Sequence, residues 1–310
     1  MRYCVSCVCD RDYTPIAGAI RGPADRLTRY IDVHSHIDQH SAEELPGIVS
    51  RARSAGVRAI ITSGVTVESS ARCVQIAHEY ETVFAGVGVH PEDMTGPLTP
   101  DGLRRLGELA ADPRVVVMSE VGLDHSPPDS FRPDPGSAWR PSTGPEWSEA
   151  QEEAFRVQLG IAREQGLAVV FHNRGATEDT LRVLRDESRG GLTGAAHYFQ
   201  GDWHYASALL DLGFYISVAK PLLRSRELQD VISKVPLERL VLETDSCPQR
   251  YKRDRTKWTE PKDLPTIAEM LAELHGLSLE EVRDRTTENA LRMLGKRAGP
   301  VRAELDRQLS

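Results

Sequence analysis

The sequence lacks the segments that carry a protein into or across a membrane. It contains no run of about 18 apolar residues, the length that a membrane-spanning helix needs. Residues 1–30 also lack the apolar stretch flanked by basic residues that is typical of a secretory signal. We therefore expect a cytoplasmic protein without a membrane partner. Its oligomeric state stays open, a monomer included.

Cysteine is scarce and unevenly placed. The five cysteines are Cys4, Cys7, Cys9, Cys73 and Cys247. An odd set in a long chain indicates reduced thiols and argues against a disulfide framework. The N-terminal cluster offers three ligands, whereas a structural zinc normally takes four. We therefore interpret residues 1–29 as a flexible extension, with a structural metal there as the less favoured alternative.

Positive charge is also in short supply. The chain has 38 Lys and Arg against 46 Asp and Glu, a formal net charge of −8. Nonspecific affinity for DNA comes mostly from Lys and Arg. The balance therefore argues against a protein that tracks phosphates over its whole surface, although it does not exclude a nuclease whose cations are metal ions.

From residue 30 onward, apolar strand-like runs alternate with amphipathic helix-like runs. The strands are expected at residues 30–33, 57–62, 83–87, 115–121, 167–171, 194–197, 214–218 and 239–243. Strands that alternate with helices pair in parallel through right-handed crossovers, and eight such units suit a closed (β/α)8 TIM barrel. A doubly wound open sheet is the alternative. It would usually carry a Gly-rich phosphate loop after the first strand, where this chain has His34-Ser35-His36.

We expect the barrel to form one domain over residues 30–296. Residues 261–274 and 278–294 read as two closing helices, followed by a polar, frayed tail at 297–310. Residues 124–147 are rich in Pro, Ser and Gly and form an irregular loop after the fourth strand. Such a loop is either a functional lid or a tolerated surface insertion.

Six metal-binding side chains follow or close the expected strands. They are His34, His36, Glu120, His172, His197 and Asp245. The C-terminal ends of barrel strands meet on one face, where active sites lie. One such histidine is usually a satisfied, half-buried residue, but six of these residues on five strand ends indicate a metal site. Imidazole with carboxylate suits Zn, Mn, Fe or Ni, and the carboxylates also admit Mg.

The number of ligands predicts two divalent metal ions, because one catalytic zinc needs only three protein ligands and a water. We assign His34, His36 and Asp245 to one ion and His172 and His197 to the other, with Glu120 bridging. Such a pair can activate water and stabilise both the attacking and the leaving oxygen. Asp245 is then also the expected acceptor of the water's proton.

These residues lie in segments that resemble the TatD family of hydrolases over residues 30–294. The matching segments are YIDVHSHID at 30–38, GVHP at 88–91, SEVGLD at 119–124, QEEAF at 151–155, VVFH at 169–172, HYFQGD at 197–202, LETD at 242–245 and TTENA at 286–290. The resemblance implies a metal-dependent hydrolase on a barrel that acts on DNA or another phosphodiester, often as an exonuclease of 3'-5' type. It implies the same ligand set, and it adds His90 as a contact to the scissile phosphate or to the attacking water.

Several positions depart from the family pattern and put the substrate in doubt. Tyr198 and Gln200 replace a common Cys and Ser, Ser246-Cys247-Pro248 replaces Ala-Pro-Tyr, and Thr259 replaces Asn. A C–N, lactone or ester hydrolase of the wider amidohydrolase type, acting on a small or tRNA-linked substrate, is therefore the alternative function. A non-enzymatic metal-binding protein is disfavoured, because clustered acidic and imidazole groups are costly without a cation.

A basic cluster with interleaved aromatic residues follows the eighth strand. It contains Arg250, Tyr251, Lys252, Arg253, Arg255, Lys257 and Trp258. Basic groups beside stacking partners suit single-stranded nucleic acid, although a solvated charged loop is the plain alternative. We predict that Arg253, Arg255 and Lys257 hold the substrate backbone and that Trp258 stacks on a base.

Overall fold

The computed structural model describes residues 29–94, 96–126, 145–187, 191–249, 252 and 254–307. The N-terminal cysteine cluster, residues 127–144 of the expected loop, and Arg250, Tyr251 and Arg253 lie outside these ranges. Within the ranges, no helix combines the length and the apolar character needed to cross a bilayer.

Eight parallel strands form one sheet in which each strand pairs with the next along the chain. The strands are β1 (Tyr30–Ser35), β2 (Val57–Ser63), β3 (Val83–Val87), β4 (Val115–Asp124), β5 (Ala168–Arg174), β6 (Gly194–Ala196), β7 (Tyr215–Val218) and β8 (Leu240–Leu242). Their β-branched and apolar composition favours extended chain that is buried on both faces. The (β/α)8 fold predicted from the sequence is thereby confirmed.

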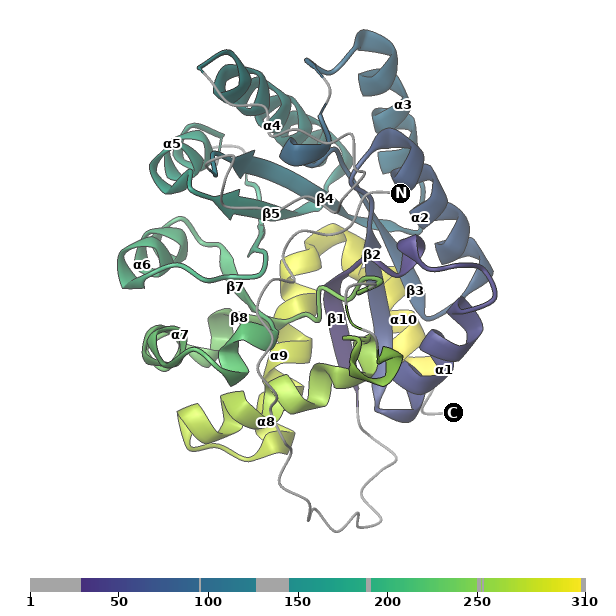
Figure 1. The fold of residues 1–310 in the computed structure, drawn as a ribbon, viewed down its shortest axis with the longest axis vertical. Helices are drawn as coiled ribbons and strands as arrows, with labels where there is room; N and C mark the ends of the chain where they lie inside the picture. Colours follow the sequence, from purple (N-terminus) through teal and green to yellow (C-terminus); the bar gives the residue numbers. More distant parts are fainter. Residues whose placement is uncertain are drawn as a thin grey trace.

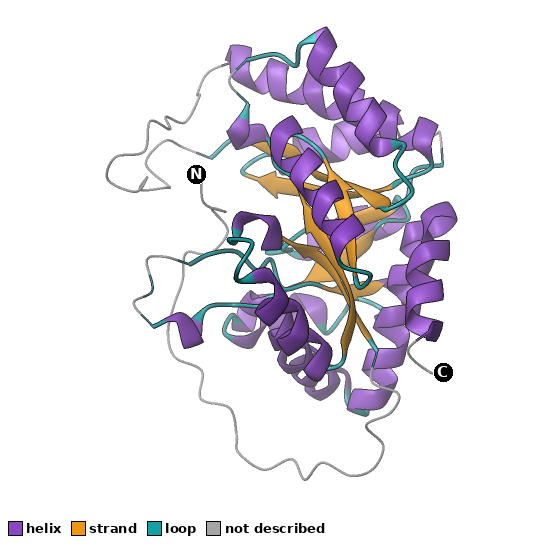
Figure 2. Cartoon of the chain, turned by 90° about the vertical axis from the view of Figure 1, so that its right-hand side faces the viewer, coloured by secondary structure: helices purple, strands orange, loops and turns teal. Residues whose placement is uncertain are grey.

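Helices connect the strands and form a ring around them (Figure 1). They are α1 (Leu45–Ser54), α2 (Val67–Glu79), α3 (Pro100–Ala110), α4 (Pro145–Gln165), α5 (Thr177–Glu187), α6 (Trp203–Asp211), α7 (Arg226–Ile232) and α8 (Leu264–His275). Seen from the side, the strands run between helices on both flanks (Figure 2). The helices bury their apolar faces on the strands, for example through Phe155 of α4 and Leu181 of α5.

The last two helices, α9 (Leu279–Leu294) and α10 (Ala298–Arg307), lie at the N-terminal ends of the strands. Asn289 donates to the carbonyls of Leu237 and Leu240 at the start of β8. Arg297 donates to carbonyls that precede or begin β4 and precede β5. The opposite face of the barrel, where the strands end, therefore stays available for a site.

The expectation of a frayed tail was wrong for the residues of α10. Val301 and Leu305, four positions apart on that helix, are buried in a cluster that also contains strand residues such as Ile31. Two apolar residues at this spacing share one helical face, so a mostly polar segment still docks.

The barrel closes between β1 and the segment after β8. The Asp245 N–H donates to the His34 carbonyl at 3.0 Å, and the His36 N–H donates to the Ser246 carbonyl at 2.7 Å. These two hydrogen bonds form the β1–β8 seam. One residue before Asp245, Thr244 donates to the buried carboxylate of Asp32 through its backbone N–H at 2.9 Å and its hydroxyl at 2.5 Å. The seam joins two strands that are far apart in sequence, directly beneath Asp245.

We predict that Thr244→Val lowers the free energy of unfolding by about 1–3 kcal/mol, because it removes a donor from a buried carboxylate. Thr244→Ser, which keeps the hydroxyl, should stay close to the wild type. Denaturant titration followed by circular dichroism measures both variants. An unfolding midpoint for Thr244→Val equal to that of the wild type would contradict this account of the seam.

Candidate metal centre

The structure brings together the six residues that the sequence predicted as metal ligands. His34 lies in β1 and His36 follows it, Glu120 lies in β4, His172 in β5, His197 directly after β6, and Asp245 after β8. All six side chains are buried. Their position at the C-terminal side of the strands is where barrel enzymes place their active sites.

Two of the predicted strand ends were too early. β4 continues four residues past Glu120, and β5 continues two residues past His172. The extra residues pair with each other, Gly122 with His172 and Asp124 with Arg174. The long β4–β5 pair therefore extends above the site and supplies additional side chains to it.

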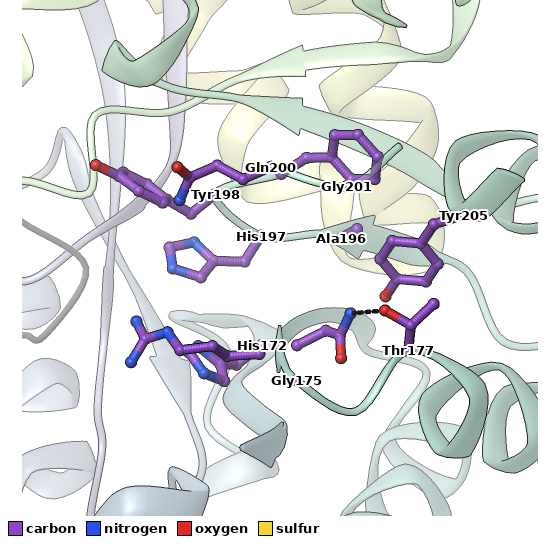
Figure 3. Close-up of a pocket in the computed structure, with 12 residues that line it drawn as sticks. His172, Gly175, Thr177, Ala196, His197, Tyr198, Gln200, Gly201 and Tyr205 are labelled. Carbon is purple, nitrogen blue, oxygen red and sulfur yellow. Dashed lines mark hydrogen bonds between the residues drawn. The ribbon is translucent and has the colours of Figure 1, made fainter. Parts of the chain in front are cut away.

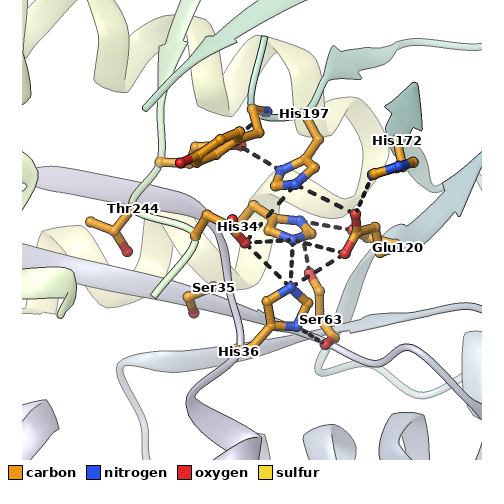
Figure 4. A network of polar contacts seen from close by, with 12 residues as sticks. His34, Ser35, His36, Ser63, Glu120, His172, His197 and Thr244 are labelled. Carbon is orange, nitrogen blue, oxygen red and sulfur yellow. Dashed lines mark hydrogen bonds and ion pairs between the residues drawn. The ribbon is translucent and has the colours of Figure 1, made fainter. Parts of the chain in front are cut away.

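The carboxylate of Glu120 contacts four imidazoles, and its two oxygens face different ones (Figure 4). Oε2 lies 3.3 Å from His36 Nε2 and 3.5 Å from His34 Nε2. Oε1 lies 3.1 Å from His172 Nδ1 and 3.4 Å from His197 Nε2. Burial opposes ionisation of Glu120, but the surrounding imidazoles, His90 and His197 foremost, hold its pKa well below the usual range.

Asp245 completes one side of the cluster. Its Oδ1 lies 3.4 Å from His36 Nε2, 3.8 Å from His34 Nε2 and 3.9 Å from His197 Nε2. Its backbone has a φ of 50°, in the left-handed region that residues other than glycine seldom occupy. The backbone hydrogen bonds of the β1–β8 seam hold this conformation and aim the carboxylate into the cluster.

Three of the imidazoles have a partner that fixes which nitrogen carries hydrogen. His36 Nδ1 lies 2.9 Å from the Ser63 carbonyl, His197 Nδ1 lies 2.9 Å from Glu243 Oε1, and His172 Nε2 lies 2.9 Å from Asp124 Oδ2. A carbonyl or carboxylate can only accept, so each of these nitrogens is the donor. With a cation in the cluster, the other nitrogen of each ring would offer its lone pair to the ion, which is the usual arrangement of a metal-binding histidine.

The donor set fits a cation. His34 Nε2 and His36 Nε2 are 3.1 Å apart, and His197 Nε2 makes no hydrogen bond within the described part of the chain. Burial lowers the pKa of His34 to about 4, so His34 binds a proton weakly and stays neutral. In each of three groups of residues, the possible ligand atoms all lie within 4.8 Å of one another. The groups are His34–His36–Glu120, His34–His197–Asp245 and His90–Glu120–His172.

His90 differs from the other four histidines. It begins the turn η3 (Pro91–Asp93) after β3, and its Nδ1 accepts a hydrogen bond from the Glu92 N–H at 3.2 Å. Its Nε2 therefore carries the hydrogen and lies 3.3 Å from Glu120 Oε1. Burial lowers the pKa of His90, but the nearby Glu120 carboxylate outweighs burial and raises it, which favours hydrogen on the nitrogen that faces Glu120. His90 is thus built as a donor at the edge of the cluster, although its distances alone would also suit a ligand.

Sequence reasoning did not assign roles to Asp124, Glu243 and Arg174. Asp124 and Glu243 hold His172 and His197, and Arg174 Nη1 lies 3.2 Å from Asp124 Oδ2. The available signal was spacing, because Glu243 precedes Asp245 by two residues and Arg174 follows His172 by two. Residues two apart on a strand share a face, as His172 and Arg174 do on β5.

The basic cluster after β8 is only partly described, since Arg253 lies outside the described residues. Arg255 forms an ion pair with Glu44, and its guanidinium lies 4.7 Å from the centre of the Trp258 ring. Trp258 is 8% exposed, and its indole N–H donates to the Lys252 carbonyl. The ring is therefore largely buried and supports its own loop, and its stacking on a base stays a prediction. Lys257 is exposed.

Comparison with known proteins places the chain in a family. Residues 31–295 match the model of the TatD related DNase family. The Bacillus subtilis protein named "Uncharacterized metal-dependent hydrolase YabD" is 31% identical over 266 residues, which cover 84% of this chain and 97% of that protein. The Salmonella typhimurium protein named "3'-5' ssDNA/RNA exonuclease TatD" is 31% identical over 260 residues, which cover 80% and 92%.

Among solved structures, the TatD homologue YjjV from Escherichia coli superposes with a TM-score of 0.73 at 25% identity, covering 86% of this chain and 98% of that one. Fold and site together define a barrel hydrolase that depends on divalent metal. The chain belongs to the TatD related DNase family.

We predict that Glu243→Gln weakens divalent-metal binding by roughly 10- to 100-fold, because a neutral amide no longer makes His197 a stronger ligand. Calorimetric titration of the metal-free protein with Mn²⁺ measures the effect. Glu238→Gln, the same change at an exposed residue that pairs with Arg285, is the matched control. Equal affinities for Glu243→Gln and the control would show that Glu243 has no such role.

Proposed function

We propose that this protein is a two-metal phosphodiesterase that removes nucleotides from the 3' end of single-stranded DNA. The observation that carries the proposal is the placement of Glu120, whose two oxygens face two separate sets of imidazoles. A carboxylate so placed suits a bridge between two cations, with His34, His36 and Asp245 on one side and His172 and His197 on the other. Bound ions would supply an activated water and offset the charge that develops on the phosphoryl oxygens.

The protein's own groups have distinct tasks in this reaction. Asp245, whose Oδ1 faces the cluster, takes the proton of the attacking water. His90 Nε2–H donates a hydrogen bond to a phosphoryl oxygen at the edge of the cluster, where it now faces Glu120. The new bond joins the water oxygen to phosphorus. The bond from phosphorus to the 3' oxygen of the preceding nucleotide breaks, and that oxygen receives a proton.

The choice of substrate rests on the relatives and on one substitution in the barrel. The Salmonella relative is named as a 3'-5' exonuclease on single-stranded DNA and RNA, and a mouse relative, 28% identical, is named as a putative deoxyribonuclease. Many two-metal amidohydrolases use a modified lysine on the fourth strand, where this chain has Glu120. A phosphodiester is therefore favoured over the C–N and lactone substrates of the alternative.

Glu120→Gln should bind fewer metal ions and lose at least about a thousandfold in turnover, the scale expected when a group that stabilises developing charge is lost. Metal analysis should find two ions per chain in the wild type and at most one in the variant. Glu187→Gln is the control for the same change in charge, because Glu187 lies at the end of α5 and pairs with Arg156 and Arg163 outside the metal centre. A variant at position 120 with two ions and near-normal turnover would remove the bridge from the mechanism.

A second prediction concerns the basic segment after β8. Replacing Arg253, Arg255 and Lys257 together by alanine should raise the Michaelis constant for DNA and flatten its salt dependence, by about 0.7 units of slope per lost contact to a single strand. Hydrolysis of bis-p-nitrophenyl phosphate should change little, because that diester is too short to reach the segment. Equal losses on both substrates would mean that the segment supports the metal centre. No change on either would leave it a solvated loop.

A further inference from the structure

A pocket of about 230 Å³ opens beside the metal centre, between the segments that follow β5 and β6. His172 and His197 line it, so the pocket and the candidate metal centre share two residues. Figure 3 shows one wall formed by Gln200 and Gly201 and the facing wall formed by Gly175 and Thr177. The residues that line it beyond the two histidines have no part in the metal chemistry proposed above.

One wall carries a side-chain amide that is fixed in place. Asn173 Nδ2 donates to Thr177 Oγ1 at 3.2 Å, and Asn173 Oδ1 accepts from the buried Thr180 hydroxyl at 3.2 Å. An amide has two N–H donors and two carbonyl lone pairs, so these bonds use half of its capacity. The amide also lies near the Tyr205 hydroxyl, so the capacity that is left suits a further polar group, as on the edge of a nucleobase.

The pocket is closed and aromatic at its far end. Figure 3 shows Tyr205 at the end away from the rings of His172 and His197. Phe199 and Tyr205 stack with ring centres 5.6 Å apart and planes 20° apart, and both are 3% exposed. Gly201 seals the same end, because a Cβ there would lie 2.6 Å from Tyr205 Cδ1. A polymer that enters from the metal side therefore cannot continue through this end.

The other wall is tied to the metal centre through Tyr198. This residue has a φ of 44°, a strained value for a residue other than glycine, and its N–H donates to Glu243 Oε1 at 2.6 Å. Glu243 also holds His197, so one carboxylate positions both the imidazole and the pocket wall. Across the pocket, Arg174 lies beside Asp124 and brings a positive charge close to His172.

We propose that this pocket binds the terminal nucleoside of a single strand, while the 5'-phosphate of that nucleoside lies between His172 and His197. The proposal rests on the phosphodiesterase function proposed above and names its substrate subsite. The volume is below the roughly 300–1,000 Å³ of sites for drug-sized ligands, which suits one nucleoside and not two. The closed end admits a chain terminus only, and the product that stays in the pocket is a nucleoside 5'-monophosphate.

The test compares two ligands that share a phosphate and differ in the nucleoside. With Mn²⁺ present, calorimetry should show that deoxyadenosine 5'-monophosphate binds the wild type at least tenfold more tightly than inorganic phosphate. Thr177→Phe, which fills the pocket from the first turn of α5, should reduce this ratio to near one. Glu178→Gln, on the same turn but exposed beside His204, should keep the wild-type ratio.

A wild type that binds both ligands equally would overturn the proposal, and so would a folded Thr177→Phe variant that keeps the tenfold ratio. Asn173→Ala is the second variant and should reduce the ratio even if Thr177→Phe does not fold. Hydrolysis of bis-p-nitrophenyl phosphate by the same samples tests the reaction separately. If that hydrolysis is absent while the nucleotide still binds tightly, the pocket stands and the proposed reaction fails.

Discussion

The whole arrangement depends on one buried carboxylate, Glu120, that faces imidazoles on two sides. Burying a carboxylate together with several imidazoles costs several kcal/mol per charge, unless opposite charges and hydrogen bonds offset that cost. No single helix or hairpin could bring five histidine side chains around one carboxylate, as they lie around Glu120. The barrel does so because the ends of its parallel strands meet on one face, and each strand contributes one or two ligands at little further cost in chain entropy.

A second set of residues fixes the orientation of the histidine rings that face the cluster. Asp124 and Glu243 hold His172 and His197 through their outer nitrogens, and the Ser63 carbonyl holds His36. For Asp124, the His172 contact outweighs burial and holds the pKa of the carboxyl well below its usual range, so it stays ionised. Fixed rings lose little freedom when an ion arrives, which is how such partners strengthen metal binding.

The fold and the six clustered residues could be predicted because they depend on local patterns. Apolar runs mark the strands, and residues two apart, such as His34 and His36, share a face. Asp124 could not be predicted as a partner of His172, because they meet only through the β4–β5 pairing beyond Glu120. The burial of Trp258 could not be predicted either, because alternating basic and aromatic residues look the same whether the ring is exposed or buried.

Recognition of a chain end also reconciles a nuclease-like site with an acidic protein. A protein that slides along DNA needs many phosphate contacts, and a net charge of −8 opposes them. A closed pocket needs few, since its walls and one fixed amide act on a single nucleoside. Arg174 is already held by Asp124, which also orients His172. The positive charge nearest the scissile phosphate is therefore coupled to the metal centre, and specificity follows from the shape of the site more than from the charge of its surroundings.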